Sequence, residues 1–345
     1  MSGGVDSSVA AGLLIERGYR VTGVFLCLGS AGGDNEESRG CCSVQDAADA
    51  RRVADRLGMD LYVLDRGREF EEIIANFAAE YSAGRTPNPC IHCNSRIKIG
   101  RLIAHADALG IDYVATGHYA RLADGGGGPA IHRGLNRSKD QSYALFALAR
   151  GHLGRLMLPI GELPNKTEVR RIARVLGLPV HDKPDSQDIC FVARGDLADL
   201  LRRRQPQAMR PGNIVDSSGK VLGRHDGFCQ FTIGQRHGLG VAGGIPLYVT
   251  HINPASAEVT IGPRSEAMGS RLRAENANWH CDLPGGEFRA TVQVRYNHSG
   301  VTGTVRAGAD GSFEVQFDEP VLAITPGQAA VVYDDQRLLG GGWIC

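Results

Sequence analysis

The spacing of apolar residues changes near residue 205, and this change constrains the fold more than any other feature of the sequence. Before it, short apolar runs such as residues 20–28 alternate with segments of helical spacing such as residues 45–57. Strands separated by helices of about 10–15 residues are typical of βαβ units, which predicts an α/β domain with a doubly wound parallel sheet. From residue 211 onward, short alternating segments are separated by turn sequences, which predicts an all-β half.

Three domains follow from this pattern. We expect an α/β domain over residues 1–200, a small β-rich domain over residues 206–265 and a C-terminal β-barrel over residues 268–345. A chain of 345 residues is long enough for two or three separate cores. The barrel prediction depends on segments such as residues 290–296, where apolar and polar residues alternate as in a half-buried strand.

The composition excludes several classes of protein. Lysine and arginine number 38, as do aspartate and glutamate, so no net charge steers the chain toward nucleic acid or an anionic membrane. No apolar run approaches the roughly 18 residues of a transmembrane helix, and Asp6 stands where a secretory leader would be basic. Nine irregularly spaced cysteines indicate reduced thiols rather than a disulfide scaffold. We therefore expect a cytoplasmic protein.

Residues 2–8, with the sequence SGGVDSS, form the strongest local motif. Two glycines let backbone N–H groups curl around an anion, and serine hydroxyls and the N-terminus of the next helix add donors. The motif predicts a phosphate-binding loop, which differs from the GxxxxGK[ST] loop because it lacks a lysine. The alternative is a glycine turn before an ordinary helix. The residues expected to hold the phosphates are Ser2, Gly3, Gly4, Val5, Asp6, Ser7 and Ser8.

The position of this loop in the chain is unusual. A phosphate-binding loop of this kind normally follows a strand, yet only one residue precedes Ser2. We therefore expect that the first strand of the sheet is missing and that Met1 is internal to a longer reading frame. The alternative is a chain that tolerates the loss of this strand.

Two cysteine motifs point to thiol chemistry. Cys90 and Cys93 form a CxxC pair, and Cys190 lies before the β-rich half, where a mobile thiol could meet the pair. We expect Cys93 just before a helix that starts near Ser95. The N-terminus of a helix lowers the pKa of a thiol, so the thiolate of Cys93 would be favoured there. By itself, CxxC fits zinc binding, disulfide exchange and iron–sulfur ligation.

Taken in order, the motifs resemble one family along essentially the whole chain. The loop resembles that of the PP-loop ATP pyrophosphatases, which transfer AMP to a substrate while the loop holds pyrophosphate. With the thiol motifs, the chain resembles the tRNA-specific 2-thiouridylases of that superfamily. The landmarks are SGGVDSS (2–8), GRTPNPC and CN (84–94), ATGHYAR (115–121), KDQSY (139–143), DSQDICF (185–191), TIGQRHGLG (232–240), VRY (294–296) and DEPVLAITPGQAAVVY (318–333).

The resemblance implies an ATP-dependent 2-thiolation of the wobble uridine in the anticodon stem-loop of tRNA. ATP would adenylate the uracil C2 oxygen with release of pyrophosphate, and sulfur would then displace AMP. Cys190 would take persulfide sulfur from an upstream donor such as a cysteine desulfurase system, and Cys93 would complete the transfer, leaving a Cys93–Cys190 disulfide. Asp6 would help to hold Mg²⁺, and Leu26 and Gly117 would contact ATP.

The resemblance also implies contacts with tRNA. The target base must leave its stack to reach an enzyme pocket, and Asn88, Pro89 and Cys90 would border it. Lys139, Asp140 and Gln141 would contact tRNA from a polar loop, although a solvated helix cap is the alternative. Arg295 and Tyr296, expected on a barrel strand, would stack on an anticodon-loop base, unless they are ordinary surface residues.

The chain departs from the family pattern at Cys90, where many members carry aspartate. Three thiolates, from Cys90, Cys93 and Cys190, could ligate a 4Fe–4S cluster with one open iron. The alternatives are a persulfide relay and a structural zinc. Of the other cysteines, Cys27, Cys229 and Cys281 are expected in the interior, and Cys41 and Cys42 have no assigned role.

Two other functions stay open from the sequence. Another PP-loop ATP pyrophosphatase, such as an amidotransferase or a carboxylate-activating synthetase, shares the SGGxDS loop but predicts neither the thiol motifs nor the KDQ loop. A non-catalytic metal-binding RNA module predicts no pyrophosphate release from ATP.

Overall fold

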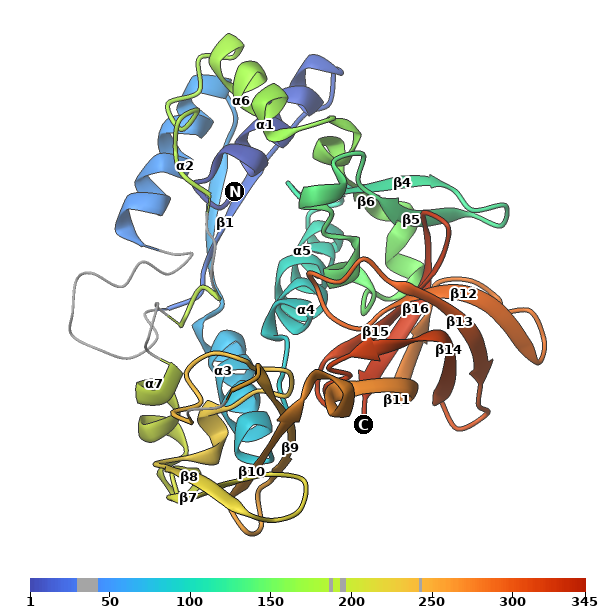
Figure 1. Cartoon of the computed structure of the whole chain (residues 1–345). Helices are drawn as coiled ribbons and strands as arrows, with labels where there is room; N and C mark the ends of the chain where they lie inside the picture. Colours follow the sequence, from blue (N-terminus) through green and yellow to red (C-terminus); the bar gives the residue numbers. More distant parts are fainter. Residues whose placement is uncertain (30–42, 186–188, 193–196, 242–243) are drawn as a thin grey trace. The chain divides into compact units, whose positions relative to one another are not determined.

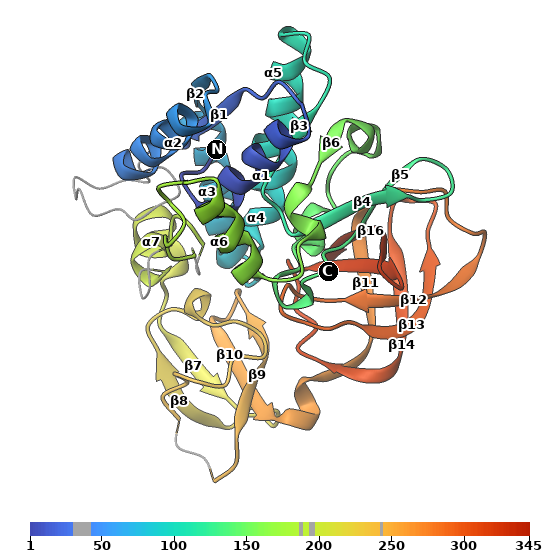
Figure 2. The same cartoon turned by 90° about the horizontal axis from the view of Figure 1, so that it is seen from above.

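The computed structural model describes residues 1–29, 43–185, 189–192, 197–241 and 244–345 (Figures 1 and 2). The chain forms two compact units. Cys41 and Cys42 lie outside the described residues. The first unit contains Met1–Ile73, Cys90–Ala193 and Gln336–Leu338, and the second contains Ile74–Pro89, Arg194–Asp335 and Leu339–Cys345.

The first unit contains short parallel strands. β1 (Gly23–Cys27) pairs with β2 (Leu61–Asp65), and β3 (Val114–Ala115) pairs with β6 (Leu156–Met157). The predicted parallel pairing is confirmed, and within the described residues it takes the form of two separate two-stranded sheets. The longer reading frame stays a prediction. An antiparallel hairpin of β4 (Ala120–Asp124) and β5 (Pro129–Arg133) follows β3.

Helices provide most of the core of this unit. α1 and α6 lie side by side (Figures 1 and 2), and Val5 and Val9 share a buried cluster with Val169 and Ala173. The helices that lie wholly or partly in this unit are α1 (Val5–Glu16), α2 (Val44–Leu57), α3 (Gly67–Ser82, which continues into the second unit after Ile73), α4 (Pro89–His92), the π-helix η1 (Cys93–Arg101), α5 (Leu102–Ala108) and α6 (Lys166–Val175). Short 3-10 helices are η2 (Arg137–Lys139), η3 (Ser142–Leu145), η4 (Arg150–Arg155) and η5 (Pro159–Glu162).

Local sequence explains where α2 begins and ends. Ser43 and Asp46 form a capping box, in which each side chain bonds the backbone N–H of the other residue. Gly58 ends the helix in the left-handed conformation that glycine adopts at little cost. The capping box fixes the N-terminus of α2, which carries acidic residues of the candidate site.

The second unit is mainly β-structure, as predicted. α7 (Leu197–Arg204) and η6 (Pro206–Ala208) precede a four-stranded sheet in the order β8-β7-β10-β9. Its elements are β7 (Gly212–Val215), β8 (Val221–His225), η7 (Phe228–Gln230), β9 (Leu247–Asn253), β10 (Glu258–Pro263) and η8 (Arg264–Ala267).

A closed barrel of six strands ends the chain. The strand order is β11-β14-β13-β12-β15-β16, and β11 also pairs with β16, which closes the barrel. Alternate residues face a core that contains Val292, Phe313 and Val315. The strands are β11 (Met268–Trp279), β12 (Glu287–Gln293), β13 (Val301–Ala307), β14 (Phe313–Leu322), β15 (Ala329–Asp334) and β16 (Arg337–Ile344). None of the described helices is long and apolar enough to cross a membrane.

Candidate active site

The helix that the sequence predicted next to the SGGVDSS loop is present as α1, but it begins at Val5, inside the motif, and not after Ser8. Gly4 is the N-cap residue, and having no side chain it leaves the first-turn N–H groups of α1 for an anion. Gly3 has a φ of +70°, which favours glycine. A Cβ at Gly3 would also collide with the carbonyl oxygen of Asp46, because α2 packs directly against the loop.

The serines of the loop fold back onto it. The Ser8 hydroxyl donates to the Gly4 carbonyl oxygen at 2.8 Å, and the Ser2 N–H donates to the Ser7 Oγ at 3.1 Å. Gly117, between β3 and β4, also approaches closely, since a Cβ there would lie 2.7 Å from the Ser7 nitrogen. The structure therefore brings Gly117 against the loop, whereas Leu26 is half-buried in β1.

An ion-pair chain begins at Asp6, in the first turn of α1. Lys166 Nζ lies 2.8 and 2.9 Å from the two carboxylate oxygens of Asp6, and the Tyr119 hydroxyl donates to Oδ1 at 2.7 Å. The same ammonium lies 2.8 Å from Asp185 Oδ1, and Lys139 Nζ donates to Asp185 Oδ2 at 3.0 Å. Burial, together with the charge of Asp6, raises the pKa of Tyr119, so this phenol stays a hydrogen-bond donor.

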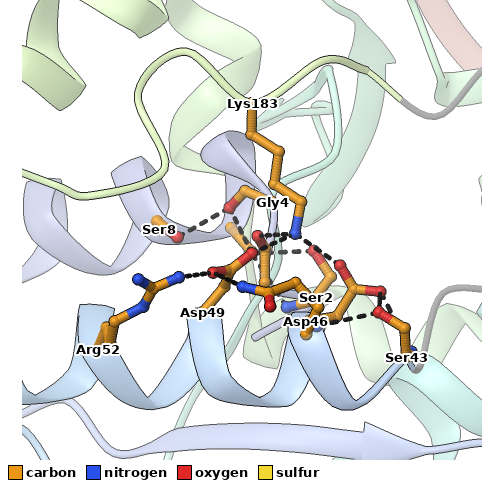
Figure 3. A network of polar contacts seen from close by, with 11 residues as sticks. Ser2, Gly4, Ser8, Ser43, Asp46, Asp49, Arg52 and Lys183 are labelled. Carbon is orange, nitrogen blue, oxygen red and sulfur yellow. Dashed lines mark hydrogen bonds and ion pairs between the residues drawn. The ribbon is translucent and has the colours of Figure 1, made fainter.

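A second network joins the loop to α2 (Figure 3). Lys183 Nζ donates to the Gly3 carbonyl oxygen at 3.0 Å, to Asp46 at 2.6 Å and to Asp49 at 2.5 Å. Arg52 also pairs with Asp49. Burial would raise the pKa of Asp49, but hydrogen bonds from Lys183 and Arg52 outweigh it and the pKa is lowered. Lys183 thus ties α2 to the backbone of the loop.

A partly buried relay connects the strand edge with the cysteine helix. The Asn94 amide donates to the Ala144 carbonyl oxygen at 3.2 Å, so its Oδ1 accepts from His118 Nε2 at 3.3 Å. His118 Nδ1 then accepts from the Thr116 hydroxyl at 2.8 Å. Burial, with a smaller effect of Lys98, lowers the pKa of His118 to about 3. This imidazole is therefore neutral. It links Thr116, next to Gly117, with Asn94, next to Cys93.

The structure corrects the expected environment of Cys93. The predicted helix start near Ser95 is wrong, because α4 begins at Pro89, whose missing N–H and fixed φ suit a first helical position. Exposed Cys90 therefore lies in the first turn, whereas Cys93 is buried one turn later, where the π-helix η1 begins. A Cβ at Gly100 would lie 2.5 Å from the Ser95 carbonyl oxygen, so this turn requires glycine.

Comparison with known proteins identifies the family. Family models match residues 1–194 (a tRNA methyl transferase HUP domain), 198–263 (a tRNA methyl transferase PRC-barrel domain) and 269–344 (an aminomethyltransferase β-barrel domain). The tRNA-specific 2-thiouridylases MnmA of Carboxydothermus hydrogenoformans, Rhodospirillum centenum and Rhodopirellula baltica are 48%, 46% and 45% identical to the chain. The alignments cover all of this chain and 96%, 90% and 94% of those proteins. The chain belongs to the tRNA-specific 2-thiouridylase family.

Among solved structures, the NMN synthetase from Francisella tularensis is one that the chain resembles. It shares 17% identity over 60% of this chain and 82% of that one, with a TM-score of 0.30. This similarity is too low to establish a shared fold.

The residues that the 2-thiouridylase resemblance assigns to tRNA differ in exposure. In the first unit, the Asp140 carboxylate pairs with Arg133 at 3.2 Å, and Gln141 Oε1 accepts from the Tyr119 N–H at 3.0 Å. The Lys139 side chain is 40% exposed, against 7% for that of Asp140. Asn88 is half-buried, Pro89 is buried and Cys90 is exposed.

The barrel residues assigned to tRNA lie in a turn, so the prediction of a strand position for them is wrong. β12 ends at Gln293, and the Gln293 amide donates to the carbonyl oxygens of Arg295 and Tyr296 at 3.1 and 2.8 Å. This buried amide stabilises the turn. Arg295 donates to the Leu322 carbonyl oxygen at 2.8 Å, and Tyr296 is 40% exposed.

The metal sites suggested for this 2-thiouridylase differ in their fit. Across the described part of the chain, no group of three His, Cys, Asp or Glu side chains is placed to hold a metal ion, so Cys90, Cys93 and half-buried Cys190 do not form a cluster site. Asp6 fits Mg²⁺ better, because Mg²⁺ needs only one or two carboxylates when phosphates supply the remaining ligands. Among the other cysteines, Cys229 is buried as predicted, and Cys27 and Cys281 are half-buried.

Several residues of the site were missed by sequence reasoning. Tyr119, Lys166, Lys183 and Asp185 surround the loop, yet none of them belongs to the SGGVDSS motif. One signal was available in the composition. The chain has only five lysines, and Lys139, Lys166 and Lys183 are three of them.

Proposed function

We propose that this member of the 2-thiouridylase family thiolates C2 of the wobble uridine of tRNA in an ATP-dependent reaction. One observation supports this most strongly: the SGGVDSS loop, Gly117, Cys93 and Cys190 belong to the same compact unit. A loop that binds phosphates and a pair of thiols are the two components that adenylation and sulfur transfer require.

The first step is adenylation. The uracil C2 oxygen attacks the α-phosphorus of ATP, a new P–O bond forms, and pyrophosphate leaves with the electrons of the bond that breaks. The first-turn N–H groups of α1 and the glycines of the loop bind the phosphates and stabilise the charge that develops on pyrophosphate. Asp6 would hold Mg²⁺, which neutralises phosphate charge when it is bound.

The second step is sulfur transfer. Cys190 carries the terminal sulfur as a persulfide received from a donor protein of the cysteine desulfurase type. The Cys93 thiolate attacks the inner sulfur, the Cys93–Cys190 disulfide forms, and hydrosulfide leaves. Hydrosulfide attacks C2, the C–O bond breaks, and AMP departs. Both cysteines are oxidised in this step, so an external thiol must reduce the disulfide before the next turnover.

We do not propose a 4Fe–4S cluster, because no group of three described His, Cys, Asp or Glu side chains is placed to hold a metal ion. Anaerobic purification followed by iron and sulfide analysis tests it directly. Stoichiometric iron with absorbance near 400 nm would replace the persulfide relay by a cluster held by Cys90, Cys93 and Cys190.

The decisive test is mass spectrometry of wobble uridine after incubation of the purified chain with tRNA, Mg·ATP and a persulfide donor. Cys93→Ser should abolish 2-thiouridine and leave tRNA-dependent pyrophosphate release intact. Cys345→Ser, which changes an exposed terminal thiol, is the matched control. Unaffected thiolation in Cys93→Ser would refute the sulfur-transfer role, and absence of thiolation by the wild type would favour another PP-loop ATP pyrophosphatase.

The remaining assignments extend this proposal. We place the catalytic domain in residues 1–200, a tRNA-binding domain in residues 206–265 and the barrel in residues 268–345. Asn88, Pro89 and Cys90 would border the flipped base, and Lys139 and exposed Tyr296 are the best placed of the other tRNA contacts. A cytoplasmic location follows from the tRNA substrate.

A further inference from the structure

Lys166, the first residue of α6, has a position that no motif of the chain explains. Its ammonium reaches both carboxylate oxygens of Asp6, at 2.8 and 2.9 Å, and Asp185 Oδ1, at 2.8 Å. The Lys166 side chain is 16% exposed and that of Asp6 31% exposed, so the pair lies close to solvent. The Lys166 Nζ also lies 5.9 Å from the centre of the Tyr119 ring. A positive charge therefore lies beside the first turn of α1.

The charges around Lys166 do not cancel. Lys139, Lys166 and Arg170 contribute three positive charges, and Asp6 and Asp185 contribute two negative ones, which leaves an excess of one positive charge. Burial would raise the pKa of Asp185, but hydrogen bonds from Lys166 and Lys139 lower it, so this carboxylate stays ionised. An excess positive charge next to a helix N-terminus attracts a polyanion.

Lys183 and Lys166 differ in their partners, which makes Lys183 a structural lysine and leaves Lys166 able to move. The three donors of Lys183 reach a backbone carbonyl oxygen, Asp46 and Asp49, and leaving them would release the loop from α2. Among the described residues the ion-pair partners of Lys166 are two carboxylates, and one of them, Asp6, is the residue suited to Mg²⁺. When a cation binds Asp6, it repels the Lys166 ammonium from that carboxylate. The phosphate oxygens of ATP can then accept hydrogen bonds from Lys166.

We propose that Lys166 is a further phosphate-binding residue of the ATP site, held on Asp6 and Asp185 until Mg·ATP arrives. The proposal rests on the ATP site of the proposed function. A lysine suits this exchange because its compact ammonium bonds carboxylate and phosphate oxygens equally well and turns on a flexible stem.

The binding test uses the full chain without tRNA. Isothermal titration should show Mg·ATP binding about 10- to 100-fold weaker in Lys166→Met, as expected for the loss of a charge-assisted hydrogen bond. AMP binding should change less than about threefold, because AMP lacks the phosphates that Lys166 meets. Lys220→Met, at an exposed lysine of the second unit, should leave both affinities unchanged. Wild-type ATP affinity in Lys166→Met, or an equal loss for ATP and AMP, overturns the proposal.

A second measurement does not depend on the variant folding. Acylation of lysines in the wild type, followed by peptide mass spectrometry, should show that Mg·ATP lowers the reactivity of Lys166 at least fivefold and that AMP does not. Equal reactivity of Lys166 with and without Mg·ATP, in a chain that binds ATP, overturns the Lys166 role and leaves the thiolation proposal standing. A wild type that binds no ATP overturns both.

Discussion

Charged residues are used differently in the loop region of the first unit and in the C-terminal barrel. Around the loop they face inward and join residues far apart in sequence: Lys166 and Asp6 are 160 positions apart, and Asp49 has only 7% of its side chain exposed. In the barrel they lie outside an apolar core, as in the pair Arg289–Asp318, with side chains 56% and 46% exposed. The first unit therefore accepts the desolvation of charge around the SGGVDSS loop, whereas the barrel keeps its charged pairs in solvent.

The largest effect is expected where the loop touches α2. Gly3→Ala combines a positive φ with a collision against the Asp46 backbone, so we expect a loss of about 2–4 kcal/mol in unfolding free energy and a loss of ATP binding of at least about a hundredfold. Urea denaturation and titration with ATP measure both. Gly58→Ala is the matched control, because Gly58 has a φ of +66° but open space around it. If Gly58→Ala loses as much unfolding free energy as Gly3→Ala, the cost of Gly3→Ala comes from its positive φ and not from the contact with α2.

Lys183→Met should have the next largest effect, because it leaves Asp46 and Asp49 without their shared cation. We expect a loss of about 2 kcal/mol, smaller than for a fully buried pair because the Lys183 side chain is 26% exposed. Chemical denaturation at pH 7 measures it, with Lys220→Met as control. An unchanged midpoint would mean that the inward charges of the first unit contribute no more than those of the barrel.

The partly buried relay of Thr116, His118 and Asn94 predicts a pH dependence of stability. The pKa of folded His118 is about 3, below the ordinary 6.5, so protonation favours the unfolded chain. Its contribution to stability is therefore complete above pH 6.5 and is lost as the pH falls toward 3, by up to about 1.4 kcal/mol per pH unit. Unfolding free energies of the wild type and His118→Gln, measured at pH 7.5 and pH 5, should differ less at pH 5. A constant difference would contradict a neutral, half-buried His118, and exposed His237→Gln serves as control.

The smallest effect is expected in the barrel. Arg289→Ala removes an exposed pair with Asp318, and we expect a change of less than about 2 °C in Tm and wild-type thiolation. Differential scanning calorimetry measures the Tm. A large shift would remove the distinction between the two regions.

The sequence predicted the components of the site better than their arrangement. The loop, Gly117 and the cysteines follow from short motifs, and the helix start at Pro89 was available from the preference of proline for a first helical position. The turn at Arg295 and Tyr296 could not be predicted, because apolar and polar residues still alternate past Gln293 in the sequence. The turn depends on hydrogen bonds from the Gln293 amide, which the sequence pattern does not reveal.

By itself, the sequence determined the division into an α/β part and a β part, the SGGVDSS motif and the family, because these depend on local periodicity and on contiguous motifs. Only the tertiary structure decided which charges meet at the loop. Lys183 joins Gly3 across 180 positions, and Lys166 joins both Asp6 and Asp185. Such pairs have no fixed spacing along the chain, since they depend on how α1, α2 and α6 pack, and packing is set by the whole core.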